Sequence, residues 1–240
     1  MKVTEIVEIS TRVLERLSNM GDELNSKLSC EKMIFPKKEN KEKEIRISEQ
    51  ELRFMFIDEF LKRCKEGYYY SVETPTVEKY SFGTCFNDIK FGEGQSALSD
   101  MMIYKREEGE YKRNLNIEFK YANVTTSHIA KDILKLVNEK PNGAFIHLLD
   151  NTDVDSLCNS TFNTFTKKNG TGVLNKLNES LKFYSKWNGG DEKQITIVIM
   201  SLKQKALIYQ TIKKGNTIAD KCSCDNILKI SCNEWKLINI

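Results

Sequence analysis

The chain has 240 residues, of which 40% are hydrophobic and 30% are charged, the proportions of an ordinary globular protein. Its 37 basic and 34 acidic residues leave a formal net charge of +3, which is too small to point to a nucleic-acid partner by itself. With only three prolines, the sequence excludes a long Pro-rich disordered linker. The length suits one large domain, or one domain with a modest appendage.

Targeting signals and disulfides are not expected either. Residues 1–20 are amphipathic and acidic, unlike the apolar core of a secretory signal, and no stretch approaches the roughly 18 apolar residues that cross a membrane. The seven cysteines are odd in number and scattered, so we expect a cytoplasmic protein with free thiols and no membrane segment. Cys222, Cys224 and Cys232 lack a standard zinc spacing, and whether they bind zinc is left open.

Two helices are expected near the N-terminus. Apolar residues at helical spacing predict the first over residues 3–28. The second begins at Ser48, which together with Glu51 has the spacing of a capping box. Between these helices, the charges of residues 37–44 alternate in sign, which is typical of a solvated loop.

The middle of the chain predicts a strand followed by a β-hairpin. The Tyr-rich run at residues 68–72 favours a strand that Pro75 interrupts or ends. Residues 97–104 predict the first strand of the hairpin, and residues 115–121, which alternate apolar and polar side chains, predict the second. The polar residues 105–114 between them are typical of a turn.

The remainder of the chain mixes strands and helices. Helices are predicted at residues 126–138 and 174–184, strands at 144–149, 195–200 and 206–212, and strand-like runs at 227–230 and 235–240. This order predicts an α/β fold with a mixed central sheet flanked by helices. We divide the chain into an N-terminal helix with a charged linker at residues 1–46 and one domain at residues 47–240.

Three residues of the predicted hairpin have the chemistry of a metal-dependent hydrolase. Asp100 lies on the first strand, whereas Glu118 and Lys120, two residues apart on the second, share one face of it. Two carboxylates suit Mg²⁺ (or Mn²⁺), which prefers oxygen ligands, and the backbone carbonyl of Phe119 could add a third oxygen. Lys120 would hold or activate the attacking water, or stabilise the charge that develops during the reaction.

These segments resemble a known signature. The pair Ser99-Asp100 and the segment 117–120 (Ile-Glu-Phe-Lys) are similar to the bipartite motif of the PD-(D/E)xK nuclease superfamily, also called restriction-endonuclease-like, with Ser99 in place of the family's Pro. The helix before the hairpin, and the helix and strand after it, match the family order over residues 48–150. The resemblance implies a restriction-endonuclease-like sheet, here with an N-terminal helical extension, and Mg²⁺-dependent cleavage of nucleic acid, DNA being our first choice.

The resemblance also implies a glutamate on the early helix. Glu51 is our choice for this further catalytic residue, although a capping role would explain it equally well. Glu59 is a rival because it lies near an apolar stripe, where a carboxylate needs a partner or a metal. Asp58 is a weaker rival.

Four polar residues near the hairpin are candidates for nucleic-acid contacts. Gln95 and Ser96 follow a glycine-rich stretch just before the Asp100 strand, and Lys112 and Arg113 lie on the predicted turn. A solvated surface position is the simpler interpretation of each. The expected partner is nucleic acid, and a homodimer is left open. The alternative function is a catalytically inactive module of the same fold that binds nucleic acid or a protein partner.

Overall fold

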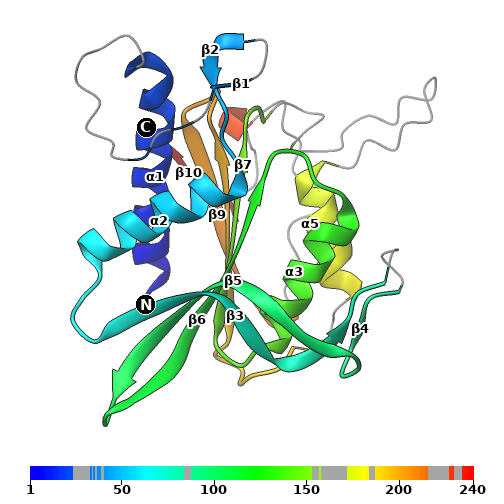
Figure 1. Cartoon of the computed structure of the whole chain (residues 1–240). Helices are drawn as coiled ribbons and strands as arrows, with labels where there is room; N and C mark the ends of the chain where they lie inside the picture. Colours follow the sequence, from blue (N-terminus) through cyan, green and yellow to red (C-terminus); the bar gives the residue numbers. More distant parts are fainter. Residues whose placement is uncertain are drawn as a thin grey trace, which may run out of the picture.

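A mixed eight-stranded sheet with helices on both faces forms the centre of the protein in the computed structural model (Figure 1). Its strands are hydrogen-bonded in the order β10-β9-β8-β7-β6-β5-β3-β4. β6, β7 and β8 run parallel, and the other neighbours are antiparallel. The structure describes residues 1–23, 33, 35, 37–38, 41–83, 88–152, 157, 172–183, 187–215, 227–229 and 234–240.

The helices and strands have the following bounds. The helices are α1 (Val3–Glu23), α2 (Glu49–Arg63), α3 (Thr126–Asn138), α5 (Val173–Phe183) and the 3₁₀ helix η2 (Ile227–Lys229). The large sheet contains β3 (Tyr68–Ser81), β4 (Lys90–Phe91), β5 (Gln95–Glu107), β6 (Glu110–Tyr121), β7 (Asn142–Leu149), β8 (Gln194–Ser201), β9 (Ala206–Lys213) and β10 (Lys236–Asn239). A separate two-stranded sheet pairs β1 (Lys37–Lys38) with β2 (Lys41–Ile45).

The sheet separates two hydrophobic layers. α1 and α2 lie on one face, and α3 and α5 lie on the other (Figure 1). In the first layer the rings of Phe56 on α2 and Phe119 on β6 meet edge to face, with centroids 5.3 Å apart. The second layer buries Ile133 of α3. Because side chains alternate along a strand, β6 directs Glu118 and Lys120 toward this second layer.

The predicted α/β class with a mixed sheet is confirmed. The helix predicted at 126–138 and the strands predicted at 144–149 and 195–200 are present at those positions. α1, which we expected to extend from the domain, packs into the same layer as α2 and contacts β8 and β9. Among the described helices, none is long and apolar enough to cross a membrane.

Three local predictions are wrong. The charged run at 37–44, expected as a loop, contributes the strands β1 and β2. The run at 227–230, expected as strand-like, forms η2 at Ile227–Lys229. The hairpin turn is only Glu108 and Gly109, with φ values of 51° and 86°, so both strands extend into the polar stretch. The ends of these two strands are exposed on both faces, so their sequence lacks the apolar–polar alternation of a half-buried strand and is as polar as that of a turn.

β3 continues past Pro75, which we expected to interrupt or end it. Its pairing with β5 shifts between Pro75 and Lys79, where the missing N–H of proline would break a regular ladder. On its outer side β3 pairs with β4 only at Tyr80 and Ser81. Pro75 therefore lies on an edge of the described sheet, where a missing donor is tolerated.

Candidate functional site

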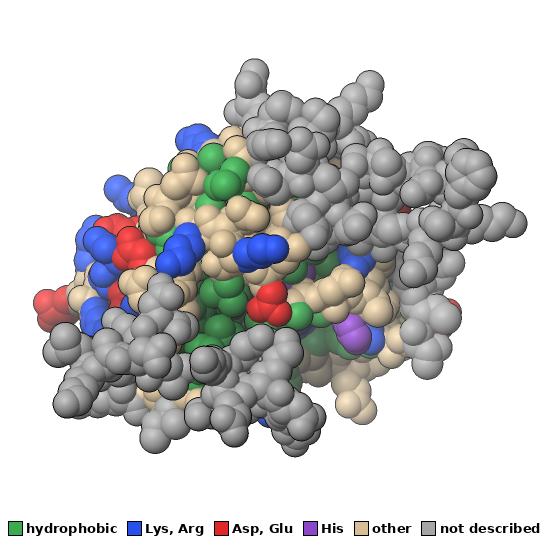
Figure 2. Space-filling view, turned by 90° about the horizontal axis from the view of Figure 1, so that it is seen from above, with side chains coloured by type: hydrophobic (Ala, Val, Ile, Leu, Met, Phe, Trp, Pro, Cys, Tyr) green, Lys and Arg blue, Asp and Glu red, His purple; other side chains and the backbone are tan. Residues whose placement is uncertain are grey.

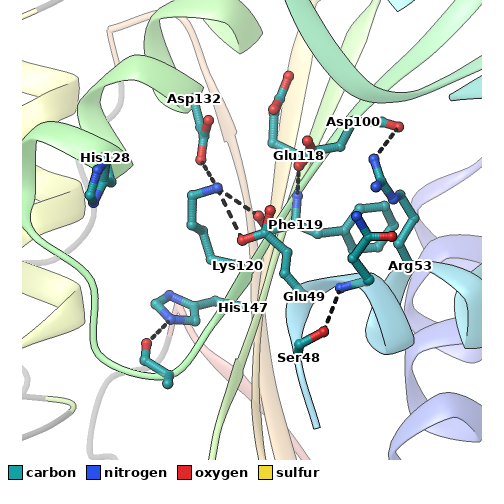
Figure 3. A network of polar contacts seen from close by, with 12 residues as sticks. Ser48, Glu49, Arg53, Asp100, Glu118, Phe119, Lys120, His128, Asp132 and His147 are labelled. Carbon is teal, nitrogen blue, oxygen red and sulfur yellow. Dashed lines mark hydrogen bonds and ion pairs between the residues drawn. The ribbon is translucent and has the colours of Figure 1, made fainter. Parts of the chain in front are cut away.

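The candidate site lies where β5 and β6 part. The pairing of these strands ends at Met101 and Ile117, whereas β6 continues beside β7. Just beyond this point the Phe119 N–H donates a hydrogen bond of 2.7 Å to Oδ2 of Asp100 (Figure 3). A buried N–H must find a partner. The Asp100 side chain supplies it in place of a strand neighbour, which fixes its carboxylate beside Glu118.

Glu118 is fully buried and pairs with a lysine of α3. Lys135 Nζ lies 2.5 Å from Glu118 Oε2 and 3.2 Å from Asp132 Oδ1. Burial raises the pKa of Glu118 well above its ordinary value, although the charge of Lys135 opposes this shift. Burial would lower the pKa of Lys135, but the carboxylates of Glu118, Asp132 and Asp100 outweigh it and raise that pKa. These carboxylates favour the charged ammonium form of Lys135.

Lys120 joins both helices that flank the site. Its Nζ lies 2.8 Å from Asp132 Oδ2 on α3 and 3.3 Å from Glu49 Oε2 on α2, and it donates to the Phe119 carbonyl at 2.9 Å (Figure 3). Burial would lower the pKa of Lys120, but Asp132, Glu49 and Asp100 raise it above its ordinary value. The ammonium is thus held in its charged form between two carboxylates and a carbonyl.

The cluster carries more negative than positive charge. It contains four carboxylates, those of Glu49, Asp100, Glu118 and Asp132, against the ammonium groups of Lys120 and Lys135. With all groups ionised, two negative charges remain uncompensated. Burial is the largest cause that raises the pKa values of Asp100 and Glu49, and like charges nearby add to it. A divalent cation at the cluster would offset these two charges.

Each ammonium group lies within ion-pair distance of two carboxylates. In the part of the chain that the structure describes, no three His, Cys, Asp or Glu side chains form a group that could hold a metal ion. One carboxylate oxygen is nevertheless unused, because Glu118 Oε1 is buried and has no hydrogen-bond partner among the described residues. Together with Asp100 and the Phe119 carbonyl, Glu118 presents hard oxygen atoms of the kind that Mg²⁺ accepts.

A buried histidine supports the end of β6. His147 on β7 pairs in register with Lys120, and its Nε2 lies 2.7 Å from the carbonyl oxygen of Ala122. Burial lowers the pKa of His147 to about 4. The ring is therefore neutral near pH 7, and its Nε2–H donates to that carbonyl. Ala122 has a φ of 58°, a conformation that is uncommon without glycine and that turns the chain toward α3.

The glutamate chosen on the early helix lies elsewhere. The Ser48 hydroxyl donates to the Glu51 carboxylate at the start of α2, whereas Glu49, two residues earlier, reaches Lys120. Its rivals are also engaged away from the cluster. Glu59 pairs with Arg63 and with Arg16, the latter at 2.6 Å, and Asp58 pairs with Arg16 at 2.5 Å. The buried carboxylate of Glu59 thus has the partners that its burial requires.

Of the four candidates for nucleic-acid contacts, two have protein partners. Arg113 lies 3.2 Å from Glu139 and donates to the Pro75 carbonyl at 2.8 Å. Lys112 lies 3.3 Å from Glu107 on the hairpin. Gln95 and Ser96 are exposed at the start of β5, the strand that carries Asp100. Cys222, Cys224 and Cys232 lie outside the described residues.

Three members of the cluster were not predicted from the sequence. Asp132 and Lys135 are buried on α3, and Glu49 opens α2. A signal for the first two was present, because they interrupt an apolar face formed by Ile129, Ile133 and Leu136. No comparable signal distinguishes Glu49 from Glu51. The comparisons with protein-family models, with curated proteins and with solved structures give no match to this chain.

Proposed function

We propose that the protein is a Mg²⁺-dependent nuclease that hydrolyses phosphodiester bonds, with DNA as the first substrate to test. The observation that carries the proposal is the largely buried cluster beyond the end of the β5–β6 pairing, where four carboxylates outnumber two lysines. The order of elements around it supports the restriction-endonuclease-like fold that the motif implies. α2 precedes the hairpin, α3 follows it, and β7 then pairs parallel to β6.

Asp100, Glu118 and the Phe119 carbonyl would hold the cation. All three are hard oxygen donors, and the unused oxygen of Glu118 supports their assignment. A bound Mg²⁺ would neutralise negative charge on the transferring phosphate and lower the pKa of a bound water. The two uncompensated charges of the cluster match the charge of one divalent ion.

The environment of Lys120 indicates which of its possible catalytic roles it can fill. Three surrounding oxygen atoms, from Asp132, Glu49 and Phe119, favour the ammonium over the neutral amine. A lysine held in its charged form is a poor general base. We therefore assign it to orienting the attacking water through a hydrogen bond and to stabilising negative charge on the phosphate.

On the face shown in Figure 2, the described side chains form no large basic block. Lys and Arg side chains (blue) lie beside Asp and Glu side chains (red), as the net charge of +3 leads one to expect. A substrate would then gain affinity from a few local contacts, of which the exposed Gln95 and Ser96 are the candidates closest in sequence to Asp100.

A binding module without catalysis is the second candidate. The observation that favours it is the ion-pair network, in which Lys120 and Lys135 already pair with the carboxylates of Glu49, Asp132 and Glu118. In that case the lysines replace the cation permanently, and the protein binds nucleic acid or a protein partner without cutting.

Cleavage assays separate the two candidates. Supercoiled plasmid and single-stranded DNA are incubated with Mg²⁺ or Mn²⁺ and with the native protein, Asp100→Asn, Lys120→Met or the control Asp58→Asn. The amide oxygen introduced by Asp100→Asn can still accept the Phe119 N–H, so this variant removes charge with little change of structure. Asp58 is a partly exposed carboxylate paired with Arg16 and Lys62.

We expect metal-dependent cutting that Asp100→Asn and Lys120→Met each reduce at least about 100-fold, and that Asp58→Asn leaves unchanged. Cutting that survives Asp100→Asn would show that the site is wrong. Specific DNA binding without cutting under any of these conditions would favour the binding module.

A further inference from the structure

The ammonium of Lys135 is enclosed by three oxygen atoms. Its Nζ is 2.5 Å from Glu118 Oε2, 3.0 Å from the carbonyl oxygen of Leu98 and 3.2 Å from Asp132 Oδ1. The side chains of Lys135, Glu118 and Asp132 are only 8%, 0% and 7% exposed. Two carboxylates and a backbone carbonyl therefore surround one positive charge that has almost no contact with solvent.

The same three oxygen atoms are ones that a divalent cation accepts. Carboxylate and backbone carbonyl oxygens are ordinary ligands of Ca²⁺, Mg²⁺ and Mn²⁺. The buried Oε1 of Glu118, which has no hydrogen-bond partner in the described part of the chain, adds a further oxygen ligand beside them. The position is thus lined for a cation, and α3 fills it with an ammonium.

We propose that Lys135 supplies the protein's own cation at this position and thereby limits the cluster to one divalent ion, the one expected at Asp100 and Glu118. Many phosphodiester hydrolases use two metal ions to stabilise the attacking and leaving oxygens. Here a fixed ammonium takes one of those places. Only the ion expected at Asp100 and Glu118 depends on the proposed function.

Removal of the Lys135 side chain would change both the charge of the cluster and the space beside it. Without Lys135 the cluster has three uncompensated negative charges instead of two, and truncation to alanine leaves room beside Glu118 and Asp132. Lys135→Ala should therefore gain a second divalent ion. Lys135→Met removes the same charge but keeps a side chain of similar length, which would block the space. An ion pair that only stabilises the fold predicts no gain in either variant.

The test is the number of Mn²⁺ ions bound per chain, measured by isothermal titration calorimetry and by electron paramagnetic resonance of free Mn²⁺. The native protein is compared with Lys135→Ala, Lys135→Met and Lys193→Ala. Lys193 is a matched control, because it is a buried lysine whose ammonium donates to the carbonyls of Val137 and Glu139 and has no carboxylate within ion-pair distance among the described residues.

We expect one ion for the native protein, Lys135→Met and Lys193→Ala, and two for Lys135→Ala. An unchanged count in Lys135→Ala, or two ions in the native protein, would overturn the inference. If the native protein binds no ion and Lys135→Ala binds one, the proposed metal site fails while the inference on Lys135 stands. No binding in either protein refutes both. If Lys135→Ala does not fold even with Mn²⁺, the equally short Lys135→Ser is titrated instead, with the same outcomes.

Discussion

Glu139 offers a direct test of how the irregular part of β3 is held. This glutamate follows the last residue of α3, and its side chain is 1% exposed. Its two carboxylate oxygens accept the N–H groups of Val77 and Glu78 at 3.1 and 3.0 Å, within the stretch where the β3–β5 pairing shifts. Arg113 adds an ion pair at 3.2 Å. One side chain therefore replaces the missing strand partner.

The substitution Glu139→Gln should destabilise the fold by about 2–4 kcal/mol. Glutamine keeps one acceptor oxygen but turns an NH₂ group toward the second backbone N–H, so one partly buried donor loses its partner and Arg113 loses its counter-ion. A charge-assisted hydrogen bond contributes about 1.5–3 kcal/mol, and a buried donor left unpaired costs about 1–3 kcal/mol. For a chain of this size the midpoint of thermal unfolding should fall by roughly 5–15 °C.

Urea unfolding followed by circular dichroism measures the change, with Glu78→Gln as the matched control. Glu78 is half-buried on the same strand, and its Oε1 accepts from Asn188 at 3.1 Å, a bond that glutamine preserves. We expect less than about 0.5 kcal/mol for this control. Equal losses in the two variants, or a loss below about 0.5 kcal/mol in Glu139→Gln, would refute the reasoning.

Four further predictions concern pH, helix capping and the role of Glu51. Burial lowers the pKa of His147 from 6.5 to about 4, so between these pH values the unfolded chain binds a proton that the folded chain does not. The free energy of unfolding of the native protein, relative to that of His147→Asn, should therefore decrease as pH falls from about 6.5 to 4. Urea unfolding should show a decrease of up to about 1.4 kcal/mol per pH unit. Burial likewise lowers the pKa of Lys193 from 10.5 to about 7, so stability relative to Lys193→Met should rise between pH 7 and 9, and a flat difference would contradict this. Ser48→Ala should lower the free energy of unfolding by about 1 kcal/mol, because α2 loses its N-cap. Glu51→Gln should leave any cleavage activity intact, since Glu51 contacts Ser48 rather than the cluster. Reduced cleavage in Glu51→Gln would show that Glu51 belongs to the site.

The strand residues of the site could be predicted because β geometry has a fixed period. Glu118 and Lys120 are two residues apart and must share a face, and the hairpin brings Asp100 to the neighbouring strand. The same logic fails for Arg113. Arg113 lies on a strand rather than in a turn. Its partner Glu139 lies beside the irregular part of β3, and no local sequence pattern predicts that irregularity.

The helical residues of the site could not be placed from sequence. Glu49 and Glu51 differ by about 200° around α2, so choosing between them requires the angle at which the helix crosses β6. Asp132 and Lys135 are charged residues within an apolar face, which signals a buried polar contact but does not say with which strand. Only the packing of α3 against the sheet brings them to Glu118.

The hydrogen bond between Asp100 and the Phe119 N–H also gives the protein an internal reporter. The chemical shift of a backbone amide is sensitive to the charge and orientation of its acceptor, and its exchange with solvent depends on whether that acceptor is present. An event that rotates or neutralises Asp100 should therefore alter the Phe119 amide. A single resonance in a ¹⁵N-labelled sample would therefore follow occupancy of the site directly, with no substrate and no turnover.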